Sequence, residues 1–305
     1  MALYRFKAAV ENPTFEWFFL VVDAGIGRSI WARNGLELES VSAAGTWTQL
    51  KERLDSGIKI GLINAAEVTL ARSYGIPVKS IAGYFGDTTA RIFVAADGPI
   101  KAPSDLNGKR IGIAATTHTS YRTVMYINNK LSIVAEPVPL GILSNNLSAL
   151  RSGEIDAFYS AEGSPLTLVE SGELRNLMSL SEIYPQPYTA VVAWASDDLI
   201  ESNPDLVRKF VTALLEIVSY LKAHPEYATE LYIKRTGATK AVADKAVASL
   251  SHVLTSEGCG SGHDLVAAVA GNWQFITESG AAPDDISVNI IDVVDPTFLP
   301  LNRPN

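Results

Sequence analysis

Short strand-like segments alternate with helical segments through the first two thirds of the chain, and this alternation most constrains the fold. A strand, a helix and a second strand in succession are the repeating unit of parallel α/β sheets. After about residue 196 the pattern changes to long amphipathic helices. The sequence therefore predicts two α/β modules and a helical C-terminal part. The expected strands are 4–10, 36–41, 59–63, 78–84, 91–95, 110–114, 134–139 and 155–159, and the expected helices are 14–34, 46–56, 65–74, 117–131, 144–152, one that opens at 204, 240–254 and 264–279.

The length of 305 residues suits two domains of about 150 residues each. Residues 91–96 and 190–196 read as extended crossings between the two modules. We therefore expect lobe one to comprise residues 1–93 and 195–305, and lobe two to comprise residues 94–194.

The charge pattern excludes several classes of protein. The formal charge is -8, with 33 acidic against 25 basic residues, and no stripe of Lys and Arg occurs. Nucleic acid is therefore not an expected partner. The apolar stretch 17–22 is far too short to cross a bilayer. One cysteine, Cys259, allows neither an internal disulfide nor a four-cysteine zinc site, and the four histidines lack the two-His helical spacing of a metal site, so no metal or cofactor is expected.

Several segments in order along the chain resemble one known family. The segment IKAPSDLNGKRIGIA at 100–114, followed by TTHTS at 116–120, resembles the centre of the nitrate, sulfonate and taurine solute-binding proteins of ABC importers. That family also includes binders of thiamine-pyrimidine precursors. Further matches are GIKIG at 57–61, residues 71–78, LRSGEIDA at 150–157, and NPDLVRKF at 203–210 leading to HPE at 224–226.

The resemblance implies a type II periplasmic-binding-protein fold: two α/β lobes, a double crossover hinge and a ligand cleft between the lobes. It also implies a small-molecule ligand, the membrane permease of an ABC importer as partner, and a monomer. Residues 1–10 read as a strand rather than a secretory leader. We therefore expect a periplasmic or extracytoplasmic protein whose leader is absent from this chain, or a cytoplasmic one if Met1 is the native start.

Polar residues that follow the expected strands are the first candidates for the site, because ligands of open α/β sheets sit beyond the carboxyl ends of the strands. Two groups of such residues occur: Thr116, Thr117, His118 and Ser120 form the first, and Asn64, Glu67 and Glu162 form the second. The first group stands at a helix start and either binds an oxygen-bearing ligand group or caps the helix. A carboxylate of the second group either selects a ligand with an N–H or a positive charge, or is an ordinary acidic residue of a first helical turn.

Aromatic side chains near strand ends are the remaining candidates, because they can sandwich a planar ligand. Asn12 and Trp17 lie at the first strand-to-helix turn, Tyr84 follows the fourth strand, and Tyr188 precedes the return crossing. Packing in the core is the alternative for each ring.

Two functions remain open from the sequence. The first is a binding protein that closes on a small polar, planar organic solute and carries out no catalysis. The alternative is a cytoplasmic enzyme on the same fold, of the decarboxylase or cofactor-biosynthesis type. We find no nucleophile–base pair or carboxylate dyad at recognisable spacing, which favours the first.

Overall fold

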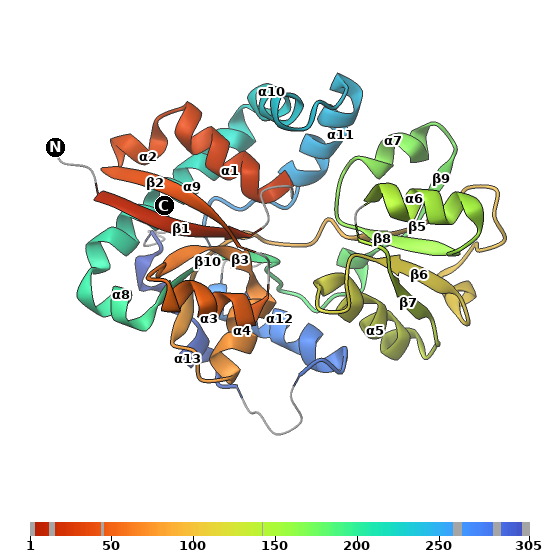
Figure 1. The fold of residues 1–305 in the computed structure, drawn as a ribbon, viewed down its shortest axis with the longest axis horizontal. Coiled ribbons are helices and arrows are strands. Elements are labelled where there is room, and N and C mark those ends of the chain that lie inside the picture. Colours follow the sequence, from red (N-terminus) through yellow and green to blue (C-terminus); the bar gives the residue numbers. More distant parts are fainter. Residues whose placement is uncertain are drawn as a thin grey trace.

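The computed structural model describes residues 4–11, 16–43, 46–141, 143–258, 264–282 and 288–300. Within these ranges the chain forms two α/β lobes that lie side by side, each built on a five-stranded sheet flanked by helices (Figure 1). No helix in the described part of the chain is both long and apolar enough to cross a membrane.

The sheet of lobe one has the strand order β2-β1-β3-β10-β4. Strand β1 runs parallel to β2 and β3, whereas β10 runs antiparallel to both β3 and β4. The strands are β1 (Tyr4–Glu11), β2 (Leu36–Ala43), β3 (Ile60–Asn64), β4 (Val78–Phe85) and β10 (Val191–Ser196).

The sheet of lobe two has the strand order β7-β6-β8-β5-β9. Strand β6 runs parallel to β7 and β8, whereas β5 runs antiparallel to β8 and β9. The strands are β5 (Arg91–Ala95), β6 (Arg110–Ile113), β7 (Glu136–Pro139), β8 (Ala157–Ser160) and β9 (Leu174–Ser179).

The expectation of parallel sheets is wrong for one strand in each lobe. Strand β5 starts at Arg91, which pairs with Ser160 at the end of β8, and β10 starts at Val191, which pairs with Asn64 at the end of β3. Each of these strands arrives from the other lobe and enters its sheet at the edge where its neighbours end. It must therefore run in the opposite direction.

The chain changes lobe in two short segments. Strand β5 lies wholly in the second sheet and β10 wholly in the first, so the connecting segments run through 86–90 and 180–190. The division of the chain at 93/94 and 194/195 stays a prediction.

The helices of lobe one come from both ends of the chain. The segment 14–34, expected as one helix, is interrupted at Ser29, whose φ of 54° is left-handed. The helices are α1 (Glu16–Gly27), α2 (Ile30–Arg33), α3 (Trp47–Asp55), α4 (Ala65–Ser73), α8 (Asp197–Ser202), α9 (Pro204–Ala223), α10 (Pro225–Thr236), α11 (Lys240–Ser251), α12 (Leu265–Glu278) and α13 (Ile290–Val293), with a 3-10 turn at Pro296–Phe298.

Helix α9 shows how the sequence positions these elements. Pro204 occupies the first turn and the Asn203 side chain accepts the Leu206 N–H at 3.2 Å, which fixes the start of the helix. Its apolar face is buried, and Phe210 stacks on Trp31 of α2 at a centroid distance of 5.4 Å. This long helix therefore anchors the C-terminal part to the core of lobe one.

Lobe two has fewer helices, and two helices of the C-terminal part reach it. Helix α12 packs against both α4 and α5, and α11 packs against α7. The lobes are therefore joined by side-chain packing as well as by the two connections. The helices of lobe two are α5 (Thr119–Leu131), α6 (Leu143–Ser152) and α7 (Pro165–Glu170), with 3-10 turns at Pro103–Leu106 and Leu180–Glu182.

Candidate functional site

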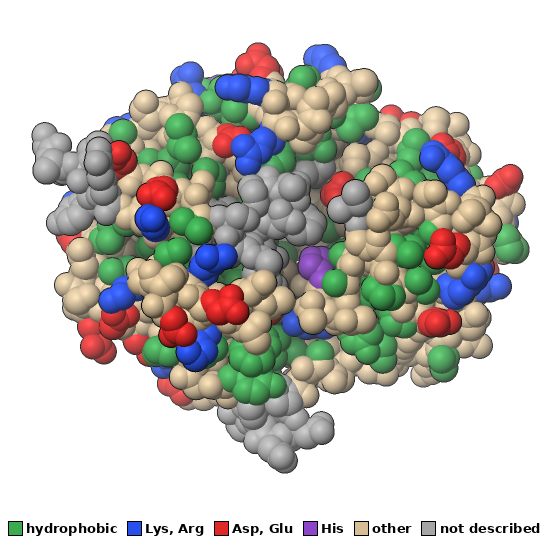
Figure 2. Space-filling view, viewed as in Figure 1, with side chains coloured by type: hydrophobic (Ala, Val, Ile, Leu, Met, Phe, Trp, Pro, Cys, Tyr) green, Lys and Arg blue, Asp and Glu red, His purple; other side chains and the backbone are tan. Residues whose placement is uncertain are grey.

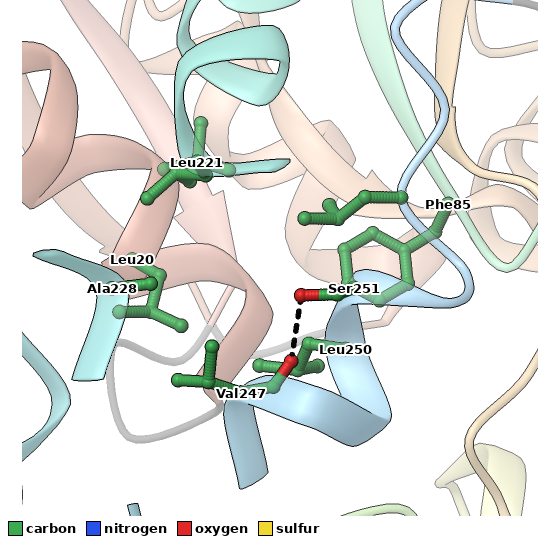
Figure 3. A pocket seen from close by; sticks show the side chains of 9 residues that line it. Leu20, Phe85, Leu221, Ala228, Val247, Leu250 and Ser251 are labelled. Atoms are coloured by element: carbon green, nitrogen blue, oxygen red, sulfur yellow. Dashed lines mark hydrogen bonds between the residues drawn. The ribbon is translucent and has the colours of Figure 1, made fainter. Parts of the chain in front are cut away.

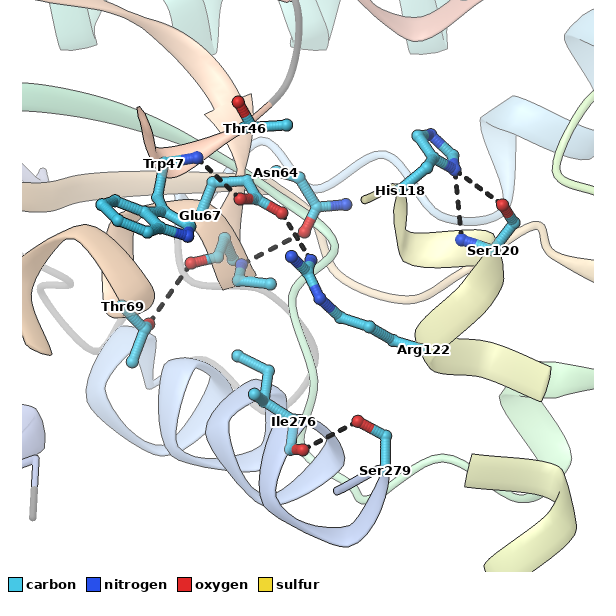
Figure 4. A network of polar contacts seen from close by, with 12 residues as sticks. Thr46, Trp47, Asn64, Glu67, Thr69, His118, Ser120, Arg122, Ile276 and Ser279 are labelled. Atoms are coloured by element: carbon cyan, nitrogen blue, oxygen red, sulfur yellow. Dashed lines mark hydrogen bonds and ion pairs between the residues drawn. The ribbon is translucent and has the colours of Figure 1, made fainter. Parts of the chain in front are cut away.

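The carboxyl ends of strands from both sheets come together at the junction between the lobes. On lobe one, β3 ends at Asn64 and leads directly into α4. On lobe two, the neighbouring strands β6 and β8 lead into segments 114–120 and 161–164. Figure 4 shows Asn64 and Glu67 of lobe one facing His118 and Arg122 of lobe two. This junction is where ligands of such sheets are bound.

A buried ion pair connects the two sides of this junction. Glu67 Oε1 accepts a hydrogen bond from Arg122 Nη1 at 2.5 Å, and Glu67 Oε2 accepts the Trp47 N–H at 2.9 Å (Figure 4). The side chains of Arg122 and Glu67 are 10% and 1% exposed. Burial raises the pKa of Glu67, and the Arg122 guanidinium and the Trp47 N–H oppose that rise. In this state each carboxylate oxygen has a protein donor and the Glu67 side chain is only 1% exposed, so a ligand N–H cannot reach it.

Asn64 and Trp47 hold the lobe-one side of the pair in place. The Asn64 Oδ1 accepts the Ala66 N–H at 3.1 Å and caps α4, which carries Glu67 in its first turn. The indole of Trp47 stacks on Tyr74 at a centroid distance of 4.2 Å and an interplanar angle of 15°. The Trp47 N–H is thereby fixed at the start of α3, where the helix dipole also favours a carboxylate.

The polar group at the start of α5 divides into capping residues and exposed ones. His118 Nδ1 accepts the Ser120 N–H at 3.1 Å, and Ser120 Oγ accepts the Ala114 N–H at 3.1 Å. Ser120 is fully buried, whereas Thr116 and Thr117 are exposed. Hydrogen bonds to backbone N–H groups therefore occupy His118 and Ser120, whereas Thr116 and Thr117 stay exposed.

His118 must be neutral to make this cap, since a protonated Nδ1 cannot accept a hydrogen bond. Burial, together with the positive charge of Arg122, lowers the pKa of His118 to about 4. The imidazole is thus uncharged at neutral pH.

Two of the expected aromatic residues are packed against other rings. Tyr188 is buried beside Tyr184 and Phe275, at centroid distances of 5.2 and 6.3 Å. Tyr84 is fully buried and edge-on to Phe85 at 5.5 Å. In this state neither ring presents an open face.

Two other expected residues fall where the structure gives no side chain. Asn12 lies outside the described residues, and Trp17 is described only as part of the backbone of α1. Their role in binding stays a prediction.

Two carboxylates near the lobe connections have no cationic partner among the described residues. The Glu162 Oε2 accepts from Ser164 Oγ at 3.3 Å, and burial raises the pKa of Glu162. Asp87, in the first connection, accepts the Thr88 N–H at 2.7 Å, and burial raises its pKa as well. Arg91, at the end of the same connection, donates to the Thr89 carbonyl and the Ser249 hydroxyl rather than to either carboxylate.

Arg122, Trp47 and Asp87 are site residues that the sequence reasoning missed. Arg122 could have been noticed, because a basic side chain among the buried positions of α5 needs a buried acid. The identity of that acid could not, since Glu67 lies 55 positions away in the other lobe.

A small apolar pocket lies elsewhere, inside lobe one (Figure 3). It is enclosed by helices α1, α9, α10 and α11, and its one labelled hydroxyl, on Ser251, already donates to the Val247 carbonyl at 2.9 Å. It has no free polar group to orient a ligand, so we assign it no binding role. Among the described residues no group of three His, Cys, Asp or Glu side chains could hold a metal ion.

Two α/β lobes joined by a double crossover, with helix starts facing each other across the junction, define a type II periplasmic-binding-protein fold. Residues 30–228 match the family model described as NMT1/THI5 like, and the chain belongs to that family. The family resemblance and the fold class expected from the sequence are both confirmed.

Solved and curated relatives agree with this assignment. The structure of the alkanesulfonate-binding protein SsuA from Xanthomonas axonopodis pv. citri bound to MOPS has a TM-score of 0.72 at 14% identity, over 94% of this chain and 96% of that one. The riboflavin-binding protein RibY of Chloroflexus aurantiacus is 24% identical over 237 residues, which are 74% of this chain and 64% of RibY. A 4-amino-5-hydroxymethyl-2-methylpyrimidine phosphate synthase of Saccharomyces cerevisiae is 22% identical over 204 residues, 61% of this chain and 58% of the synthase. The chain thus matches less than two thirds of the length of either curated relative.

Proposed function

We propose that this chain is a solute-binding protein of an ABC importer, which captures a small, planar organic solute between its lobes and presents the closed form to a membrane permease. The observation that carries the proposal is that charged and polar groups from both lobes meet at one junction, as Glu67 and Arg122 do. A ligand that contacts both lobes favours the closed state. The likeness in fold to an alkanesulfonate-binding protein and in sequence to a riboflavin-binding protein supports it.

Two carboxylates near the lobe connections support a ligand that carries N–H groups. Glu162 and Asp87 have no cationic partner among the described residues, and each can accept a hydrogen bond from a ligand. Each would repel a bare inorganic anion by about 1 to 4 kcal/mol at contact distance. The exposed hydroxyls of Thr116 and Thr117 can orient an oxygen atom of the ligand.

The remaining features of this proposal concern location and partners. A protein with this role works outside the cytoplasm, acts as a monomer and has no nucleic-acid partner. On the face shown in Figure 2, Lys and Arg side chains are interspersed with Asp and Glu side chains, without a continuous basic stripe. That distribution supports the absence of a nucleic-acid surface.

An enzyme is the second candidate, because the yeast relative is a synthase. The Ser120 Oγ lies 3.0 Å from His118 Nδ1, which is the spacing of a nucleophile and its base. However, Ser120 is fully buried and its oxygen accepts a backbone N–H, so a substrate cannot reach it. The junction therefore favours binding over catalysis.

A ligand screen tests the proposal. We expect planar heterocycles with N–H donors, flavins among them, to raise the melting temperature of the purified chain, and nitrate and simple alkanesulfonates to leave it unchanged. Chromatography of the best ligand after prolonged incubation should return it intact. Conversion of the ligand would instead support the enzyme, and stabilisation by nitrate alone would contradict the planar ligand.

A further inference from the structure

Three ion pairs join the two lobes in the described part of the chain, and they differ in burial. Lys245 pairs with Glu170, and Lys130 lies 3.8 Å from Glu278, with all four side chains 37 to 57% exposed. Exposed pairs of this kind contribute little to stability. The third pair, Arg122 with Glu67, is almost completely buried, and the distance from Arg122 Nη1 to Glu67 Oε1 is 2.5 Å.

The two members of the buried pair are held differently. Glu67 is fixed within lobe one, where α4 carries it and the Trp47 N–H donates to its second oxygen at 2.9 Å. Arg122 belongs to α5 of lobe two, and Glu67 is the one acid with which it pairs among the described residues. Separation of the lobes would leave Glu67 with a donor but would take Arg122 away from its anion.

We propose that the Glu67–Arg122 pair is an interlobe latch that sets the balance between the open and closed forms of the ligand-free protein. The inference rests on the proposed function, since it assumes that the lobes open and close.

The physical reason lies in the cost of an unpaired buried charge. In the closed form each charge compensates the other, and in the open form water solvates both. If one partner is neutral, closure buries the other charge without compensation, which is strongly unfavourable. Neutralising either residue alone should therefore open the lobes, whereas neutralising both should restore much of the closed form.

The latch also makes a prediction about ligand entry. A ligand reaches the junction only when the lobes separate, so a latch that holds the empty protein closed slows association. Glu67→Gln and Arg122→Gln, each of which should open the lobes, should therefore bind the ligand with a higher association rate than wild type or the double variant.

Pulsed electron–electron double resonance on the ligand-free full chain tests the latch. One spin label is placed on an exposed position of each lobe, and the distance between the two labels is measured. We expect Glu67→Gln and Arg122→Gln to raise the ratio of open to closed forms at least about tenfold. The double variant Glu67→Gln/Arg122→Met should lie closer to wild type than either single variant. Lys245→Gln removes an exposed interlobe pair and is the matched control, which should leave the distances unchanged.

Circular dichroism must show that each variant is folded. If Arg122→Gln does not fold, Arg122→Lys replaces it as the test variant. Lysine keeps the positive charge but changes its geometry, so we expect it to raise the ratio of open to closed forms less than tenfold. Folded single variants with wild-type distances, or an equal opening in Lys245→Gln, would overturn the latch. Lobes that stay fixed in every variant, with or without the ligands of the screen, would instead overturn the proposed binding function.

Discussion

Gly163 of lobe two lies directly against Ala246 of α11: a Cβ placed at residue 163 would come within 2.3 Å of the Ala246 Cα. The neighbour is backbone, which cannot rotate away as a side chain can. The lobes therefore approach each other at this point as closely as a glycine allows.

The first prediction follows from this contact. Gly163→Ala should push α11 away from lobe two, destabilise the protein by about 1 to 3 kcal/mol and increase the separation of the lobes, as measured by denaturation and by small-angle scattering. Gly112→Ala is the control, because a Cβ at residue 112 would crowd Asn146 within lobe two. It should reduce stability without changing the separation, and an unchanged separation in Gly163→Ala would contradict the prediction.

The second prediction concerns pH and His118. The folded protein keeps His118 neutral down to a pKa of about 4, whereas an unfolded histidine takes up a proton near pH 6.5. Between these values the unfolded state binds one more proton, so the free energy of unfolding decreases as the pH falls from about 6.5 to about 4. We expect His118 to lower the free energy of unfolding by about 1 to 3 kcal/mol over this pH range.

His118→Asn isolates that contribution, because asparagine can still cap α5 but does not titrate. Urea denaturation at several pH values should show wild type losing stability relative to the variant below about pH 6.5. Parallel curves for the two proteins over this range would show that His118 is not held neutral.

The third prediction separates structural from exposed hydroxyls at the start of α5. Ser120→Ala removes the acceptor of the part-buried Ala114 N–H, to which a fully buried hydroxyl is bonded, and should cost about 1 to 3 kcal/mol of unfolding free energy. Thr117→Ala should cost less than about 0.5 kcal/mol because residue 117 is exposed. Equal costs in chemical denaturation would contradict this division.

Local patterns were sufficient to predict much of the fold. The alternation of strands and helices, together with signals such as Asn203-Pro204, gives elements whose positions agree with the structure to within a few residues. Strand β9 was missed because LRNLMS has neither strict alternation nor a continuous apolar run. Helix α10 was missed as well, because Pro225 occupies its first turn, where proline starts a helix as readily as it ends the one before. The antiparallel direction of β5 and β10 could not be derived either, since it depends on the path of the chain between lobes.

The site was less predictable than the fold for a related reason. Glu67 was singled out by its place after a strand, but its partner Arg122 lies across the lobe junction, and no pattern in one sequence reports such a pairing. Tyr84 and Tyr188 stand near strand ends as expected, yet burial against neighbouring rings decides where their faces point. Both the pairing of Glu67 with Arg122 and the burial of the two tyrosines depend on packing between residues far apart in the chain. The spacing of residues in a single sequence does not reveal such packing.

The last prediction concerns the ligand itself, and calorimetry on wild type, Trp17→Ala and Thr117→Ala tests it. If the ligand is planar, loss of the Trp17 ring should weaken binding at least about tenfold, since stacking adds about 0.5 to 1.5 kcal/mol to the burial of the ring. Loss of the Thr117 hydroxyl should weaken binding by about 0.5 to 1.5 kcal/mol, the usual net contribution of one hydrogen bond. Thermal melting should show both variants folded, so that a loss of affinity is not a loss of structure. Tight binding of nitrate or a simple alkanesulfonate, with an affinity that Trp17→Ala leaves intact, would show that the planar-ligand hypothesis is wrong and that Glu162 and Asp87 point away from the ligand.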